Sequence, residues 1–474
     1  MENKLRVVLA CDTFGPDVNG AARFAERLAA GLARRGHDMH IIAPEVKGLS
    51  GTNREIHDGA ELTVHRFPSI QIRKELSVRM MKPIGLKGKL GQLLDELKPD
   101  AVHIQSHLVV GRLLVGECKK RGIKTIATNH TMPENLIRYS VRIPEFFERP
   151  IMKFGWWDTG RVLKKMDKVT TPTRRAADIL ERESGLRDVL AISCGIDASR
   201  FINDTPTSNQ DPRVLFVGRL DYEKRLDILI RAIHQISSEI DVTLEIVGNG
   251  GERDTLKKLS VELGVEDRVK FLGFVSEEEL PKAYERASVF AMPSIAELQS
   301  IATMEAMASG RPVIAANAMA LPHLVHSGDN GYLYEPEDVD ELSMRLREVL
   351  TADKHELERM SENSLHLIQA HDITNTLNIF ENLYRGIGEF APTTEDNLVG
   401  YSEPIGRLSE SLRERVNSFR SSASELRGRM DEIRFGLRER ITEAREDLRE
   451  QFDGVKEDFN KARDRFRSND KDSD

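Results

Sequence analysis

Short apolar segments alternate with amphipathic segments through the first half of the chain. The apolar segments have the length and composition of buried strands, and the others repeat apolar residues at helical spacing. Taken in order, the expected strands and helices span residues 5–11, 21–35, 39–43, 62–67, 88–96, 101–104, 108–121 and 124–128. This alternation predicts the α/β fold class, with a doubly wound and mainly parallel sheet.

The alternation starts again near the middle of the chain. The apolar segments that are typical of strands in a second sheet span residues 213–218, 244–248 and 269–273. We therefore expect two Rossmann-like domains, over residues 1–195 and 196–370, joined by a hinge near 193–201. Ligands of open α/β sheets collect at the carboxyl ends of the strands, so two such domains facing each other predict one interdomain cleft.

The composition changes after residue 390. We expect a linker over residues 391–404, a long amphipathic helix over 405–467 and a disordered tail over 468–474. Apolar residues recur in the long segment about every 3.6 positions, which is the period of a straight helix. Such a helix can lie in a membrane interface, pair with a second copy in a homodimer, or stand alone in solvent. Its glycines and its near-balanced charge count against the last alternative.

Composition and charge exclude several classes of protein. The chain has 474 residues, enough for two or three domains that each bury a core. Its formal net charge of −8 argues against general nucleic-acid binding. The three cysteines, Cys11, Cys118 and Cys194, have neither the spacing of metal ligands nor that of a disulfide framework. We expect a cytoplasmic protein without a signal peptide or a spanning helix, so that any membrane contact is peripheral.

Two glutamates, Glu297 and Glu305, lie eight residues apart between strand-like segments at 287–292 and 311–316. The pattern predicts a strand, a helix that begins near Leu298, and a second strand. The first N–H groups of a helix lack intrahelical partners and carry partial positive charge, which suits a phosphate. One carboxylate before that end and another about two turns into the helix can accept hydrogen bonds from hydroxyls on either side of the phosphate. A nucleotide sugar has this layout, although the same spacing also occurs on solvated helix faces.

The segment from Glu297 to Gly310, with its E-x7-E spacing and its ending Glu-Ala-Met-Ala-Ser-Gly, resembles the signature of retaining GT-B glycosyltransferases, above all glycosyltransferase family 4. The resemblance covers residues 5–387. It implies transfer of a sugar from a nucleoside diphosphate sugar with retention of the anomeric configuration, without an enzymatic nucleophile. It also implies that residues 371–390 cross back to the first domain, and that the enzyme needs no cofactor and no essential metal.

The same resemblance assigns roles around the two glutamates. Glu297 would orient the transferred sugar, and Glu305 would hold the ribose. The start of the helix would face the diphosphate through the residues Leu298, Gln299, Ser300 and Ile301.

Two cations follow the expected strand at 213–218. Arg219 and Lys224 lie five residues apart in a loop, where a guanidinium and an ammonium can grip a diphosphate leaving group. The spacing matches the family pattern G-R-x-x-x-x-K, and the alternative is a pair of solvated surface charges.

Glycines mark two further loops. Gly20 opens an expected helix, where a residue without a side chain lets the backbone approach a phosphate. The family usually has Gly-Gly here, whereas this chain has either Asn19-Gly20 or Gly20-Ala21 at that place, which leaves two registers for the contact. The resemblance further implies a nucleotide contact at Gly248 in the second-domain glycine loop, and a contact with the base at Val275.

Histidines follow two of the expected strands. His130 comes after the strand at 124–128, where the family carries a histidine close to the donor's sugar and phosphate, so the resemblance makes it an active-site hydrogen-bonding group. His107 is expected to face the same cleft.

The acceptor is expected from the first domain. Cations and aromatic residues mix between residues 138 and 161, including both tryptophans, Trp156 and Trp157. Such a surface attracts an anionic membrane, and the alternative is a mixture of core aromatics and solvated charges. Segments 129–135 and 296–300 resemble bacterial members that glycosylate diacylglycerol, with phosphatidylinositol mannosyltransferases as relatives.

We therefore expect a hexosyltransferase that uses a UDP- or GDP-sugar and a membrane glycerolipid at the inner face of the plasma membrane, without a nucleic-acid partner. A soluble sugar acceptor and a non-catalytic scaffold that acts through the long helix remain alternatives. An NAD-dependent oxidoreductase is disfavoured because the glycine fingerprint is missing.

Overall fold

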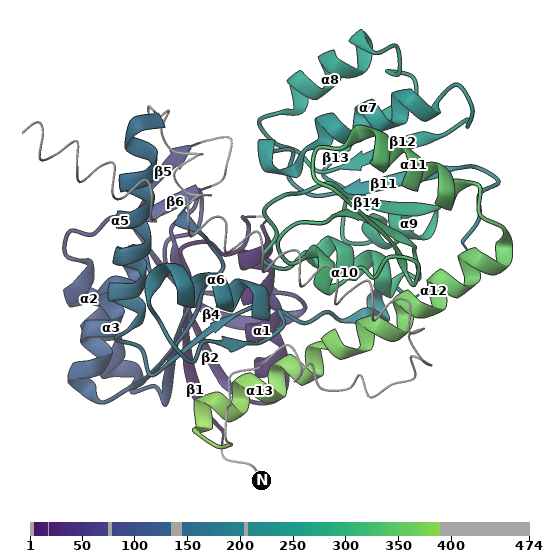
Figure 1. Ribbon diagram of the computed structural model, residues 1–474. Helices are drawn as coiled ribbons and strands as arrows, with labels where there is room; N and C mark the ends of the chain where they lie inside the picture. Colours follow the sequence, from purple (N-terminus) through teal and green to yellow (C-terminus); the bar gives the residue numbers. More distant parts are fainter. Residues whose placement is uncertain (1–3, 18, 74–77, 134–144, 203–206, 389–474) are drawn as a thin grey trace, which may run out of the picture. The chain divides into compact units, whose positions relative to one another are not determined.

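The computed structural model describes residues 4–17, 19–73, 78–133, 145–202 and 207–388 of the chain (Figure 1). These residues form two α/β domains, each built on its own largely parallel sheet. The expected linker, long amphipathic helix and tail, residues 391–474, lie outside the described residues.

The first sheet has eight strands in the order β10-β9-β8-β7-β1-β2-β4-β3. Its neighbours are parallel except β3, which pairs antiparallel with β4. Its central strands are buried on both faces, which accounts for their continuous apolar sequences. The strands are β1 (Arg6–Ala10), β2 (Asp38–Pro44), β3 (Gly51–His57), β4 (Ala60–Phe67), β7 (Ala101–Ile104), β8 (Lys124–Thr128), β9 (Lys168–Thr171) and β10 (Leu190–Ala191).

Helices and one hairpin complete the first domain. The described helices are α1 (Gly20–Arg34), α2 (Leu86–Leu97), α3 (Val109–Arg121), α5 (Glu145–Leu163) and α6 (Arg174–Ser184). The hairpin pairs β5 (Ser69–Arg73) with β6 (Val78–Met81). The chain reverses its direction of travel across the sheet between β1 and β7, so the loops after these strands diverge and leave room for a ligand.

The second sheet has six parallel strands in the order β13-β12-β11-β14-β15-β16, which is the Rossmann order. The strands are β11 (Arg213–Val217), β12 (Thr243–Val247), β13 (Val269–Gly273), β14 (Val289–Met292), β15 (Val313–Ala316) and β16 (Gly331–Tyr334). The helices are α7 (Leu226–Ile236), α8 (Arg253–Glu262), α9 (Glu279–Glu285), α10 (Ile301–Ala308), α11 (Val339–Leu350) and α12 (Lys354–Ile368). The order reverses between β11 and β14, which places the expected ligand site at the carboxyl ends of these two strands.

Two segments pass between the domains side by side. The N–H of Ile196 donates to the carbonyl of His371 at 2.8 Å, and the N–H of Ile373 donates to the carbonyl of Ile196 at 2.9 Å. Helix α13 (Ile373–Arg385) then packs on the first domain, where a Cβ on Gly31 of α1 would lie 2.7 Å from the side chain of Leu377. The glycine therefore allows close contact between α1 and α13. The α13 residues that join the core of the first domain are Leu377, Phe380, Leu383 and Tyr384.

Candidate active site

A pocket of about 270 Å³ lies at the reversal point of the second sheet. The loops after β11, β12 and β14 line one side of it, and the start of α1 from the first domain lines the other. The residues expected at the site that line the pocket are Gly20, Arg219, Lys224, Gly248, Val275, Glu297, Gln299, Ser300, Ile301 and Glu305. Segments up to 285 residues apart in the sequence therefore meet at one place.

Helix α10 begins later than the sequence pattern suggests. It starts at Ile301 rather than near Leu298, and Ser300 is its N-cap, with a side chain that accepts from the N–H of Thr303. Serine is a favoured N-cap because its oxygen satisfies one of the orphan N–H groups. Glu305 is then the fifth helical residue, about one turn from the start. Glu305 therefore lies closer to the start of the helix than expected, whereas Glu297 lies farther from it, on the loop before the N-cap.

Leu298 does not line the pocket. Its carbonyl accepts from the hydroxyl of Thr173 at 2.9 Å, and its side chain joins the core of the first domain. The prediction that Leu298 belongs to the helix start was wrong, because tertiary packing holds this residue in the loop before the N-cap.

The Gln299 side chain makes hydrogen bonds to other parts of the protein rather than facing the pocket with free polar atoms. Its Oε1 accepts from the N–H of Cys194 at 2.8 Å, and its Nε2 donates to Ser193 Oγ at 3.0 Å. Gln299 therefore ties the second-domain loop to the connection between the domains, and only its backbone remains to face a ligand. Ser300 is similarly occupied as the cap of α10.

The first glutamate of the pair forms an ion pair with a cation of the β11 loop. Lys224 Nζ donates to Glu297 Oε1, and the two side chains are 15% and 11% exposed. The N–H of Ile295 donates to the carbonyl of Glu223 at 3.0 Å, which holds the two loops together. Burial raises the pKa of Glu223, and the Lys224 charge opposes that shift. The pair places an ammonium beside the carboxylate that precedes α10.

Arg219 lies at the edge of the same pocket and is about one-third exposed. Its guanidinium contacts Asp221 at 2.7 Å and Glu223 at 3.3 Å. These carboxylates hold the guanidinium in the loop that follows β11. Arg219, Lys224 and the N-terminus of α10 together supply positive charge on one side of the cavity.

The second glutamate is held from both domains. Arg27 Nη2 of α1 donates to Glu305 Oε1 at 2.9 Å, and the Tyr284 hydroxyl of α9 donates to Glu305 Oε2 at 3.0 Å. Burial together with the Glu305 charge raises the pKa of Tyr284, so the phenol keeps its proton and remains a donor. Sequence reasoning missed both partners, because neither belongs to a motif.

Two glycine positions differ in what they require. At Gly248, φ is +126° and a Cβ would lie 1.9 Å from the carbonyl oxygen of Gly218, so only glycine fits where the chain turns after β12. At Gly20, by contrast, a Cβ would approach only Ile301, at 4.0 Å. Asn19 caps α1 there by accepting from the N–H of Ala22 at 2.9 Å. An asparagine at position 19 is therefore well suited to the start of α1.

His130 does not line the pocket and instead ends a buried polar network. Its Nε2 bonds to Gln105 Oε1 at 2.7 Å, and Gln105 Nε2 donates to His103 Nε2 at 3.1 Å. His103 Nδ1 bonds to the Tyr384 hydroxyl at 2.7 Å, which links the network to α13. A carbonyl oxygen only accepts, so with this amide orientation His130 carries its proton on Nε2 and leaves Nδ1 as an acceptor.

Burial lowers the pKa of His130 from 6.5 to about 4. The folded pKa is below the ordinary value, so the neutral ring contributes stability above pH 6.5 that is lost as the pH falls toward 4. His103 behaves alike, since burial lowers its pKa to about 3. The sequence did contain a signal for this network, namely two polar residues, His103 and Gln105, at the end of an apolar strand.

His107 bonds to Thr159 of α5 at 3.1 Å and does not line the pocket.

We expect Gln105→Leu to lower kcat on the order of tenfold, because the Nε2–H of His130 loses its acceptor and a buried donor is left unpaired. Steady-state kinetics would measure the loss. His130→Ala is the matched control: adding Gln105→Leu to it should change kcat little, since both changes act through one ring. An equal, additive loss in both backgrounds would contradict a positioning role for Gln105.

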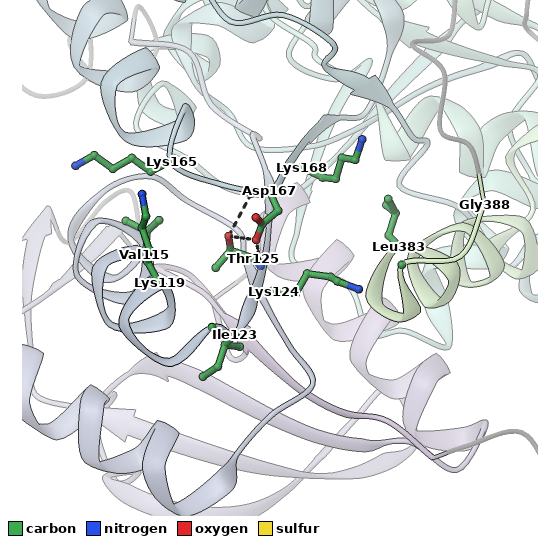
Figure 2. A pocket seen from close by; sticks show the side chains of 12 residues that line it. Val115, Lys119, Ile123, Lys124, Thr125, Lys165, Asp167, Lys168, Leu383 and Gly388 are labelled. Carbon is green, nitrogen blue, oxygen red and sulfur yellow. Dashed lines mark hydrogen bonds between the residues drawn. The ribbon is translucent and has the colours of Figure 1, made fainter.

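A larger pocket, of about 850 Å³, lies at the opposite edge of the first domain. It contains the first residues of β8 and β9, which is the amino edge of the sheet. Figure 2 shows lysine side chains spreading to different sides of Thr125 and Asp167 rather than converging on one point. The Asp167 carboxylate accepts from Thr125 at 2.7 and 2.8 Å. The lysines are Lys119, Lys124, Lys165 and Lys168. The larger volume of this pocket therefore does not make it the candidate active site.

The described residues show neither a metal cluster nor a membrane-spanning helix. No three side chains of His, Cys, Asp or Glu gather there as a metal ion would require. No helix in the described ranges combines the length and the apolar character needed to cross a bilayer. The absence of an essential metal stays a prediction.

Two family models match successive parts of the chain. The model described as "Glycosyltransferase Family 4" matches residues 18–200, and the one described as "Glycosyl transferases group 1" matches residues 197–366. The boundary between them coincides with the connection between the two sheets.

Curated relatives and solved structures are similar over most of the chain. An alpha-monoglucosyldiacylglycerol synthase from Streptococcus pneumoniae is 25% identical, over 79% of this chain and 85% of the relative. A GDP-mannose-dependent alpha-mannosyltransferase from Corynebacterium glutamicum is 28% identical, over 71% of this chain and 78% of the relative. The structure of Anabaena HepE in complex with UDP-glucose superposes with a TM-score of 0.63 at 20% identity, over 81% of this chain and 100% of HepE.

Proposed function

The chain belongs to the glycosyltransferases, with a family 4 domain followed by a group 1 domain on a GT-B fold, and from this premise we propose that it moves a hexose from a UDP- or GDP-sugar to a membrane glycerolipid. Use of a nucleotide sugar follows from the family. The identity of the hexose, retention at the anomeric carbon and the lipid acceptor are the proposed parts.

One observation carries the proposal for the donor. At the pocket, Lys224, Arg219 and the N-terminus of α10 supply positive charge between two carboxylates, Glu297 on the loop and Glu305 inside the helix. A diphosphate bound at the cations would extend its sugar toward Glu297 and its ribose toward Glu305. Val275 and Gly248 line the same pocket, where the base and the backbone contacts are proposed.

The proposed chemistry follows from this charge distribution. The bond between the anomeric carbon and the diphosphate breaks, and negative charge develops on the diphosphate as it leaves. Preorganised cations and backbone N–H groups stabilise that charge most in the transition state. The acceptor hydroxyl oxygen replaces the diphosphate on the same face of the sugar, and its proton passes to the departing phosphate oxygen. No enzymatic nucleophile and no metal are needed in this scheme.

His130 is proposed to act from the first domain. Its ring is neutral near pH 7, and its Nδ1 is an acceptor for a hydroxyl of the sugar. His130 does not line the pocket described above, so this contact requires the bound donor or a small approach of the domains.

A specific feature of α5 favours a lipid acceptor. Phe154 and Trp157 project from this helix with 63% and 56% of their surface exposed, while the adjacent Trp156 is buried in the core. The Arg161 guanidinium lies over the Trp157 ring at 5.4 Å. An exposed aromatic pair beside cations is what a membrane interface with anionic headgroups attracts. The name of the S. pneumoniae relative refers to a glycosylated diacylglycerol, which supports the same class of acceptor.

The location and assembly follow as proposals. A lipid acceptor and a nucleotide sugar would meet at the cytoplasmic face of the plasma membrane, where the protein would bind peripherally. The long helix expected at residues 405–467 would assist by binding the same surface or by pairing two copies.

We expect the protein to transfer label from UDP-glucose or GDP-mannose to diacylglycerol in vesicles that contain phosphatidylglycerol. A thermal-shift screen with UDP and GDP identifies the donor first, since a ligand at one hundred times its Kd stabilises the native state by about 2.7 kcal/mol. Soluble mono- and disaccharides serve as competing acceptors in the same assay. Turnover on soluble sugars alone would reject the lipid acceptor and leave the glycosyltransferase assignment intact.

A scaffold that works through its long helix is the alternative from another class. Such a protein would be indifferent to changes at Arg219 or Glu305. Turnover by the wild-type protein that disappears in Arg219→Ala and Glu305→Ala variants of unchanged thermal stability would therefore reject the scaffold.

A further inference from the structure

Arg27 is a first-domain side chain in the donor pocket that no sequence motif singles out. It lies on α1 and lines the same cavity as Lys224 and Glu297. Its Nη2 donates to Glu305 Oε1 at 2.9 Å, and the two side chains are only 12% and 7% exposed. An arginine of the first domain is therefore placed directly against the carboxylate proposed to hold the ribose.

The other terminal nitrogen of the Arg27 guanidinium, Nη1, makes no hydrogen bond within the described residues. Arg27 Nη1 is also buried. A buried charged donor without an acceptor is costly, and most such groups in folded proteins are paired. A binding site accounts for it, because a ligand oxygen can satisfy the donor.

The Glu305 carboxylate is fixed in orientation but not saturated. Arg27 bonds to one of its oxygens and the Tyr284 hydroxyl bonds to the other at 3.0 Å. Each carboxylate oxygen has two acceptor positions, so each retains one for a ligand hydroxyl. A hydroxyl that donates its proton to Glu305 still has an oxygen that can accept. Two adjacent hydroxyls, as on a ribose, match a carboxylate flanked by one unused N–H.

Building on the proposed function, we infer that Arg27 binds the ribose of the donor nucleotide directly. Its Nη1 donates a hydrogen bond to a ribose hydroxyl, and the same hydroxyl donates a hydrogen bond to the Glu305 carboxylate. The ribose is then held between the two domains, with Glu305 from the second and Arg27 from the first. Binding of the nucleotide thereby favours the arrangement in which α1 and α10 lie together. Arg27 is a specificity-determining residue for the ribose rather than a participant in bond breaking.

The test compares ribose and deoxyribose nucleotides on matched variants. Binding of UDP, 2′-deoxy-UDP and 3′-deoxy-UDP, or the GDP series if GDP binds more tightly, is measured by calorimetry on the full chain. Arg27→Met removes the guanidinium, and Arg27→Lys keeps the charge with a single ammonium. Arg34→Met is the control, because Arg34 lies on the same helix, makes an ion pair with Asp58 at 3.2 Å and does not line the pocket.

We expect the wild type to prefer the ribose nucleotide over one of the deoxy analogues by roughly tenfold to a hundredfold. That ratio should fall to within about threefold in Arg27→Met and Arg27→Lys and stay unchanged in Arg34→Met. If both Arg27 variants weaken UDP and its deoxy analogues by the same factor, Arg27 serves only as a structural ion pair and the inference is overturned. If the wild type binds no nucleotide, the proposed function fails and this inference fails with it.

Discussion

Lys224→Ala is expected to lower kcat by roughly two to three orders of magnitude, the range seen when one preorganised group that stabilises developing negative charge is removed. Lys224 pairs with Glu297 on the loop before α10, and its side chain is largely buried. Its charge would be replaced by water, which must reorganise as the diphosphate leaves. Steady-state kinetics with saturating donor would measure the effect as a loss in kcat rather than in KM alone.

Lys282→Ala is the matched control, because Lys282 is an exposed lysine of the same domain that pairs with Glu279. It should leave kcat unchanged. Lys224 also neutralises Glu297, so the effects of Lys224→Ala and Glu297→Gln should be strongly non-additive. Retention of more than about a tenth of wild-type kcat in Lys224→Ala would contradict a role for Lys224 at the leaving group.

Gly248→Ala is expected to destabilise the protein by about 3 kcal/mol or more, which corresponds to a fall of roughly 10 °C in the thermal midpoint. The added Cβ would lie 1.9 Å from Gly218 O and 2.9 Å from Gly218 C, and φ is +126°. Because these contacts are backbone, no side-chain rotation relieves them, and the loops after β11 and β12 must separate. Circular dichroism during heating would measure the midpoint, and nucleotide affinity should fall with it because Gly248 lines the pocket.

Gly251→Ala provides the comparison within the same loop. A Cβ at Gly251 would meet nothing within 4 Å, so the substitution should change the midpoint little. Equal midpoints for Gly248→Ala and Gly251→Ala would show that the loops are not packed as described.

Much of the lining of the proposed donor pocket could be predicted from the sequence because its parts are local. Arg219 and Lys224 follow one strand, and Glu297 and Glu305 bracket one helix start, so each pair is visible as a short pattern. The start of helix α10 was harder to predict, because Leu298 and Gln299 are residue types that a helix also accepts. The Ser300 cap and the packing of Leu298 against the first domain decide where α10 begins.

The partners of the site residues were not predictable in the same way. Glu305 bonds to Arg27 from 278 positions earlier in the chain, and His103 bonds to Tyr384 from 281 positions later. Gln105 and Gln299 look like ordinary polar residues until the fold brings them to His130 and to the connection between the domains. Nothing in their immediate neighbours identifies them.

The sequence by itself determined the α/β class, the two domains and most of the charged side chains that line the pocket, namely Arg219, Lys224, Glu297 and Glu305. These features depend on residues that lie close together in the chain, namely the periodicity of strands and helices and the E-x7-E spacing. They can therefore be recognised in the sequence without the folded structure. Only the tertiary structure decided that Leu298 leaves the site, that His130 ends a buried network, and that Arg27 reaches Glu305. These outcomes depend on burial and on hydrogen bonds between segments that are distant in sequence, and the folded chain alone brings those segments together.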